Sequence, residues 1–175
     1  MESSQEYVHY DSNSPIQSIC ENVRKDCKVD FAGIAFEGKK SKKICWHYAA
    51  GNRNEKFRRM EVQYGKGIAG RVIATGRPVE IPSFPKDIEG KAVAYPIMLA
   101  EQLVSARAVP IYREGLPKGA FLIGRRTSRP FSEVEQKILE DAVNKLERLF
   151  SNNLLPDLEG EWNENDHAFK ETERE

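Results

Sequence analysis

Apolar residues recur at helical spacing near both ends of the chain. Within residues 14–29 they recur at i, i+3, i+4 and i+7, which predicts an amphipathic helix whose buried face carries Ile16, Ile19, Cys20, Val23 and Cys27. Ser14 suits the N-cap of this helix and Pro15 its first position. Near the other end, Ser132 and Glu135 form a capping box, and an apolar stripe runs from Val134 to Phe150. We expect two long helices, one at each end of the folded region.

The residues between these helices alternate or cluster as strands do. Apolar runs at 30–38 and 42–51 predict a hairpin, as do runs at 105–114 and 118–126, with further strands expected at 55–64 and 77–82. Pro110 inside one of these runs predicts a bulge or an edge position, because proline cannot donate a ladder hydrogen bond. Consecutive strands joined by tight turns predict a mainly antiparallel sheet.

The order of elements predicts a single α+β domain over residues 14–154. The first and last helices would cover one face of a central sheet. The irregular middle, with short helices near 68–74 and 97–104, would cover the other face and enclose a small ligand pocket there. Residues 1–13 are expected to be flexible. Residues 155–175 are expected to be a disordered acidic tail, since residues 156–175 carry eight acidic side chains against Lys170 and Arg174, a net charge of −6.

The stretch "YGKGIAGRVIATGRPVEIP" places glycines at the start of the short helix near residue 68. A helix start leaves its first N–H groups without intrahelical partners and carries a partial positive charge. Together these features form an anion site that needs no basic side chain. Pro96 can open a second helix that Ile97 begins. Two helix starts directed at one cavity could share a small anion.

The side chains near these two starts favour a weakly hydrated monovalent anion. Ile68, Ala69 and Ile97 are apolar, while Trp46 and Tyr95 offer an aromatic wall with one polar atom each. Such a cage suits nitrate, because phosphate or sulfate would demand more donors. The same pattern also fits a tight glycine turn beside ordinary core aromatics, and both interpretations stay open at this point.

The segments "SARAVPIYREG", "KGAFLIGRR" and "FSEVEQKILEDAVNKL", together with the glycine turn, resemble a GAF domain, a small-ligand sensor fold, over residues 15–150. With "DFAGIAF", "CWHYAAGNRNEKFRRM" and "YPIMLAEQL", the chain is also similar to the stand-alone NreA-type nitrate receptors. That resemblance implies a non-enzymatic receptor that binds nitrate and modulates a sensor histidine kinase. It implies an anion, nitrate or another such as iodide, held without metal or cofactor by Trp46, Gly67, Ile68, Ala69, Tyr95, Pro96 and Ile97.

Two other functions are weighed against this one. GAF-type free methionine sulfoxide reductases use cysteines, but Cys20, Cys27 and Cys45 show no CxxC spacing and no neighbouring histidine pair, so buried packing is expected for them. A GAF module for a cyclic nucleotide or another organic ligand is the second alternative.

Charge and hydropathy bear on partners and location. A formal net charge of +0 and the lack of a helix-turn-helix pattern argue against nucleic acid binding. The chain holds no run of 18 apolar residues that would span a membrane. The sparse cysteines suit a reducing cytoplasm. The last helix could also pair with a copy of itself, so a homodimer is a further expectation.

Overall fold

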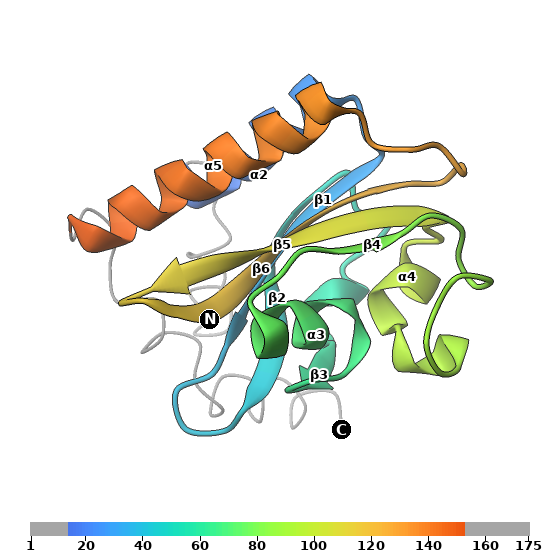
Figure 1. Ribbon diagram of the computed structural model, residues 1–175, viewed down its shortest axis with the longest axis horizontal. Helices are drawn as coiled ribbons and strands as arrows, with labels where there is room; N and C mark the ends of the chain where they lie inside the picture. The colour runs from blue at the N-terminus through green and yellow to red at the C-terminus, as the bar shows by residue number, and fades with distance from the viewer. Residues whose placement is uncertain (1–13, 153–175) are drawn as a thin grey trace, which may run out of the picture.

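Six strands form one antiparallel sheet in the order β3-β2-β1-β6-β5-β4. This computed structural model describes residues 14–152 (Figure 1). The predictions for residues 1–13 and 155–175 lie outside these residues. The strands are β1 (Phe31–Glu37), β2 (Lys43–Ala50), β3 (Glu61–Gln63), β4 (Val79–Ile81), β5 (Ser105–Arg113) and β6 (Leu116–Arg125). The helices are α2 (Pro15–Cys27), α3 (Gly67–Thr75), α4 (Pro96–Ala100) and α5 (Glu133–Ser151), with 3-10 turns η2 (Lys56–Arg59) and η3 (Ala92–Ala94).

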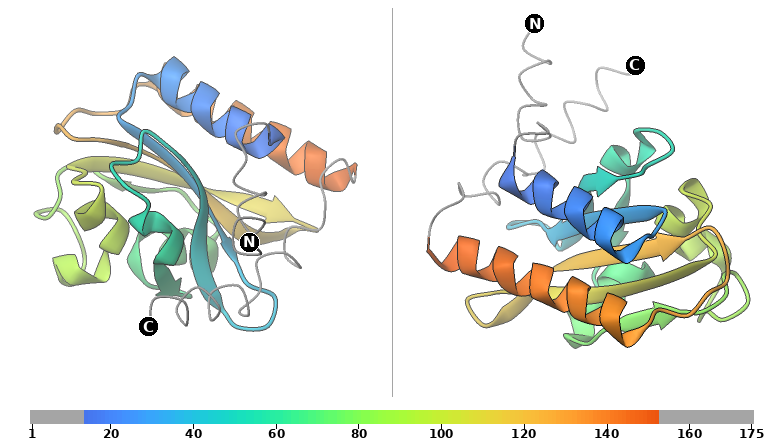
Figure 2. Two further views of the ribbon diagram at one scale, coloured as in Figure 1. Left: turned by 180° about the vertical axis from the view of Figure 1, so that it is seen from behind. Right: turned by 90° about the horizontal axis from the view of Figure 1, so that it is seen from above.

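The two long helices lie side by side on one face of the sheet (Figure 2). Ser14 caps α2 by accepting a hydrogen bond from the Ile16 amide, and Ser132 forms the expected capping box with Glu135 at the start of α5. The apolar stripes of both helices pack on alternate residues of the strands, such as Ile34 of β1 and Ile123 of β6. The predicted helix caps and shared face are confirmed, and the stripes are buried or partly buried except at Val134, which is 69% exposed in the first turn of α5.

The middle of the chain covers the opposite face. A second apolar cluster joins α3, α4 and their connecting segments to the residues of β1, β2 and β6 that point away from α2 and α5, including Phe31, Ala35 and Leu122. Figure 1 shows α3 and α4 below the sheet and α5 above it. The predicted α+β architecture is therefore confirmed, with a fully antiparallel sheet.

Two local predictions needed correction. Residues 55–64 were expected to form one strand, but they form η2 followed by the three-residue β3, because Lys56–Arg59 make a helical turn that buries Phe57. The helix expected at 97–104 ends at Ala100, and Gln102 has a positive φ of 55° that turns the chain toward β5.

Pro110 is placed as the sequence predicted. The ladder between β4 and β5 ends at Ala108, so Pro110 is paired with β6 alone and lies at an edge position. A register shift between Ile111 and Tyr112 follows it. Within residues 14–152, no helix combines the length and the apolar character needed to cross a bilayer.

Candidate functional site

The start of α3 is rich in glycine and has no side-chain cap. Lys66 is the N-cap residue, and its side chain makes no capping hydrogen bond. Gly67, the first helical residue, has a φ of 65°, a conformation that side-chain-bearing residues rarely adopt. A methyl group on Gly67 would lie 3.1 Å from the Ala94 carbonyl oxygen, and one on Gly70 would lie 2.4 Å from that of Gln63. The glycines thus allow the first turn of α3 to approach both β3 and η3 closely.

The segment facing this turn runs from η3 into α4. Tyr95 is the N-cap residue of α4 and Pro96 its first residue. The Tyr95 hydroxyl donates a hydrogen bond of 2.8 Å to the Glu89 carbonyl oxygen, and its ring meets that of Phe84 edge-on at 6.0 Å. Tyr95 therefore stabilises the loop that precedes it, and its hydroxyl proton is already donated to a group of the protein.

The predicted site residues come together in space. Trp46, Ile68, Ala69, Tyr95 and Ile97 belong to one buried cluster, and each is at most 2% exposed. Gly67 is buried beside them and Pro96 is half-buried.

A bulge in β2 orients the tryptophan. Trp46 pairs with Ala35 and Tyr48 with Ile34, so His47 is the extra residue. The His47 ring lies 6.4 Å from that of Phe36, which belongs to the cluster under α2 and α5. Trp46 and His47 therefore point to opposite faces of the sheet.

Two basic residues, Lys66 and Arg71, lie near this turn, and Lys66 is exposed. Arg71 is not fully exposed, because it pairs with Glu89 at 3.4 Å. This ion pair and the Tyr95 hydroxyl bond both involve Glu89, so α3 and α4 are linked through the same loop residue.

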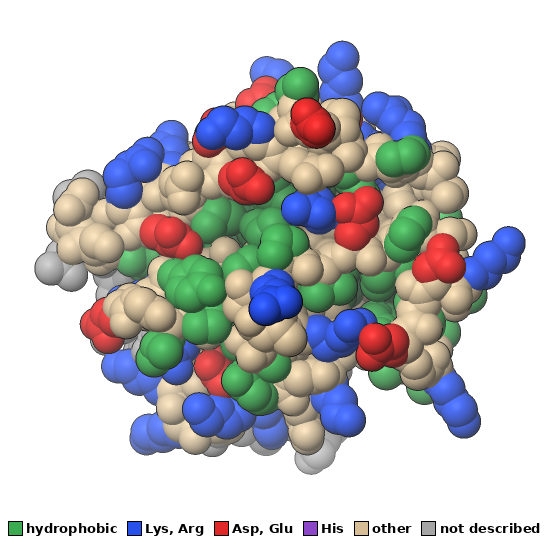
Figure 3. All heavy atoms as spheres, in the orientation of Figure 1, with side chains coloured by type: hydrophobic (Ala, Val, Ile, Leu, Met, Phe, Trp, Pro, Cys, Tyr) green, Lys and Arg blue, Asp and Glu red, His purple; other side chains and the backbone are tan. Residues whose placement is uncertain are grey.

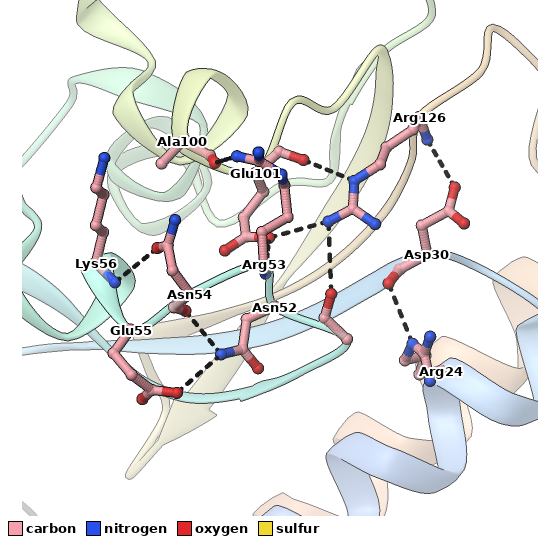
Figure 4. A network of polar contacts seen from close by, with 11 residues as sticks. Arg24, Asp30, Asn52, Arg53, Asn54, Glu55, Lys56, Ala100, Glu101 and Arg126 are labelled. Carbon is pink, nitrogen blue, oxygen red and sulfur yellow. Dashed lines mark hydrogen bonds and ion pairs between the residues drawn. The ribbon is translucent and has the colours of Figure 1, made fainter.

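A polar network holds the end of α4 (Figure 4). Glu101 is fully buried, and its Oε1 accepts hydrogen bonds from the Arg53 amide at 2.8 Å and from Arg126 Nη2 at 3.0 Å. Arg126 Nε donates to the Glu101 carbonyl oxygen at 2.8 Å, and Arg53 Nη1 donates to that of Ala100 at 3.0 Å. Two arginines from different loops thus fix the C-terminal end of α4.

The same network reaches the other face of the sheet. The Arg126 amide donates to Asp30 Oδ2 at 2.7 Å, and Arg24 of α2 donates through Nε to the Asp30 carbonyl oxygen at 3.1 Å. Burial raises the pKa of the Glu101 carboxyl, while the Arg53 amide and the Arg126 guanidinium act in the opposite direction. Sequence reasoning missed Glu101, although it is the only acid in the run "IMLAEQLV".

The cysteines pack as expected. Cys20 donates a weak hydrogen bond from Sγ to the Ala32 carbonyl oxygen at 3.3 Å, and Cys27 does the same to Glu135 at 3.6 Å. Both lie in the cluster under α2 and α5, away from Trp46. Burial raises the pKa of the Cys20 thiol and takes that of Cys27 to about 11, which suppresses the reactive thiolate. None of the three cysteines is in a disulfide, and no group of His, Cys, Asp and Glu side chains within residues 14–152 could hold a metal ion.

Comparison with known proteins identifies the family. A model of the GAF domain matches residues 14–151. The chain belongs to the GAF domain family. A comparison with curated proteins gives no match for this GAF domain.

Two solved structures from Staphylococcus aureus have 34% sequence identity to this chain. One is an NreA protein mutated in its nitrate binding site, for which the alignment covers 67% of this chain and 87% of that chain with a TM-score of 0.62. Another is a hypothetical protein, with 69% and 99% covered and a TM-score of 0.63.

Other GAF structures are more distant in sequence. A free methionine-R-sulfoxide reductase from Neisseria meningitidis, solved in complex with its substrate, is 15% identical, with 85% of this chain and 83% of that chain covered and a TM-score of 0.64. At that identity, the likeness concerns the fold alone.

Proposed function

We propose that this GAF domain is a nitrate receptor. The observation that carries the proposal is the 34% identity to an NreA protein that has a nitrate binding site, and the burial of most of the predicted anion-site residues in one apolar cluster supports it. The amides at the start of α3 would donate to the anion, since Lys66 supplies no side-chain cap there. Ile68, Ala69 and Ile97 would exclude water, which favours a weakly hydrated guest.

In this proposal the aromatic residues serve different roles. Trp46 forms a wall on the sheet side and can present its indole N–H. Tyr95 positions the segment rather than donating its proton, because the Glu89 carbonyl oxygen already takes that bond. The backbone at Pro96 and Ile97 would close the site from the α4 side.

We further propose that occupancy is passed by contact to a partner sensor histidine kinase in the cytoplasm. A bound anion that bridges Ile68 and Ile97 would hold residues 83–103 against the sheet. The Glu101–Arg126–Asp30–Arg24 contacts then give α2, on the far face, a physical connection to that segment. A coupling of about 1 to 3 kcal/mol between nitrate and kinase binding would suffice for regulation.

Two measurements on the purified protein test this proposal: isothermal titration calorimetry for binding and thermal unfolding for stability. Each is made with nitrate, nitrite, iodide, chloride, methionine sulfoxide and cyclic nucleotides. Nitrate at about a hundred times its dissociation constant should add about 2.7 kcal/mol to the free energy of unfolding. Hydrogen exchange with and without nitrate should show protection concentrated in residues 83–103 and around Ile68. No response to millimolar nitrate, with a response to an organic ligand, would overturn the proposal.

A further inference from the structure

A cavity lies on the face of the sheet that α3 covers, at the end where β1 stops and β6 begins. Its volume is about 390 Å³, near the lower end of the range typical of small-molecule sites. Its lining comes from β1, α3 and β6 and from the residues that flank β2 and β3, and it includes Glu37, Lys42, Ile73 and Lys118. It contains none of the residues proposed to hold nitrate.

Glu37 is the unusual member of this lining. Its position on β1 places it on the same sheet face as Phe31 and Ala35, so the side chain points toward α3 rather than toward α2 and α5. The side chain is 3% exposed, and its buried Oε2 atom makes no hydrogen bond. A buried carboxylate oxygen without a donor is costly and rare, and one explanation for it is a bound group that completes the site.

The two ammonium groups near Glu37 do not supply that donor. Lys118 Nζ lies 3.6 Å from Oε1 and Lys42 Nζ lies 3.9 Å from Oε2, both longer than hydrogen bonds. The side chain of Lys42 is 74% exposed, so it reaches in from solvent at the tip of the β1–β2 turn. Figure 3 shows basic side chains gathered around this end of the molecule, below α3.

These charges select the chemistry of a ligand. A simple cation would meet Glu37 but would also face Lys42 and Lys118. A simple anion would meet the lysines but would leave the buried Glu37 Oε2 without a hydrogen-bond donor. A molecule with one ammonium and one carboxylate group satisfies all three side chains at once, with the ammonium at Glu37 Oε2 and the carboxylate between the lysines.

The rest of the lining fits an apolar substituent. Ile73 and Pro117 contribute hydrocarbon surface, while Leu116 and Tyr64 stand at the rim with 56% and 50% of their surface exposed. Burial of a guest against these side chains would also cover apolar surface that is now open to water. We propose that this cavity binds a free α-amino acid with an apolar side chain, independently of the nitrate site.

The experiment uses the full chain and L-leucine as the probe. Two analogues each lack one charge: 3-methylbutylamine has no carboxylate, and 4-methylpentanoate has no ammonium. Titrations are followed by the amide resonances of Lys42, Leu116 and Lys118, with those of Gly67 and Ala69 reporting separately on the nitrate site. L-leucine should shift the first set only and bind at least about tenfold more tightly than either analogue.

Variants then test the assigned contacts. Glu37→Gln should weaken L-leucine binding about tenfold or more, whereas Glu61→Gln, whose carboxylate pairs with Lys43 at 3.5 Å outside the lining, should not. If Glu37→Gln fails to fold, the double variant Lys42→Gln/Lys118→Gln decides, since removing both cations should reverse the preference in favour of the amine. Equal binding of all three probes, or no shift at about 10 mM L-leucine in a protein that still responds to nitrate, would overturn the proposal.

Discussion

A methyl group added at Gly67 tests whether the contact between α3 and η3 holds the anion site. Gly67→Ala forces alanine into a φ of 65°, which costs about 1–2 kcal/mol. It also places the new methyl carbon 3.1 Å from the Ala94 carbonyl oxygen, close enough to require η3 to move by a few tenths of an ångström. Because Tyr95, Pro96 and Ile97 follow Ala94 directly, that shift would widen the gap between the two helix starts.

Gly65→Ala is the matched control. Gly65 has a φ of 84°, so the backbone penalty is of the same kind, but nothing lies within 4 Å of a methyl group added there. Both variants should lower the free energy of unfolding by about 1–2 kcal/mol, or the melting temperature by roughly 3 to 8 °C for a domain of this size. Only Gly67→Ala should also lower nitrate affinity, by about tenfold, which corresponds to 1.4 kcal/mol.

Chemical denaturation gives the stability of each variant, and isothermal titration gives its nitrate affinity. The comparison is informative because both substitutions introduce the same kind of backbone strain, but only Gly67→Ala places a methyl group close to η3. If Gly65→Ala and Gly67→Ala reduce nitrate affinity equally, or if neither does, the approach of α3 to η3 is not what positions the anion.

Three further outcomes are expected. Ala69→Glu should abolish nitrate binding, because it directs a carboxylate at the anion position, while circular dichroism shows a folded domain; retained binding would contradict the proposed site. Changing Cys20, Cys27 and Cys45 together to Ala should leave nitrate affinity within about threefold although it lowers thermal stability, since each buried cavity costs stability; loss of binding in the folded variant would count against the assignment of these residues to packing. Burial raises the pKa of Glu101 above 4.5, so the folded state binds this proton more tightly and the Glu101 contribution to stability falls as pH rises from about 4.5 toward neutrality. Glu101→Gln should flatten that fall in urea denaturation series, and an unchanged slope would contradict it.

The parts of the fold that the sequence predicts well are those where one local rule dominates. Both long helices carry a cap and an apolar stripe, and these two signals agree along their whole length. Pro110 was also informative, because a missing N–H restricts a residue to a few positions in a sheet.

The middle of the chain was predicted less well, because its conformation depends on contacts with residues far away in the sequence. Residues 56–59 have the composition of a strand or a turn, and they form η2 where Phe57 can be buried against the sheet. The end of α4 is set by Glu101, whose partners Arg53 and Arg126 lie 48 and 25 residues away in the chain. A local sequence pattern does not predict contacts between residues so far apart in the chain.

In the candidate nitrate site, too, some features follow from local motifs and others depend on how distant segments fold. The glycine turn and the spacing of Pro96 and Ile97 were visible as motifs, and the resemblance to a known family linked them to Trp46. The use of the Tyr95 hydroxyl by Glu89 could not be seen in the sequence, because it depends on how the loop from 83 to 95 folds back on itself.

The two outermost strands limit how copies of this domain can associate. β3 and β4 are each only three residues long, so each margin of the sheet offers few unpaired backbone groups to an incoming strand. Strand addition across these margins would form few hydrogen bonds. Within the described residues, α2 and α5 are instead the longest helices and pack against each other, and Val134 at the start of α5 is an exposed apolar residue. Any dimer of this domain should therefore be built helix against helix, and the sheets of the two copies should stay separate.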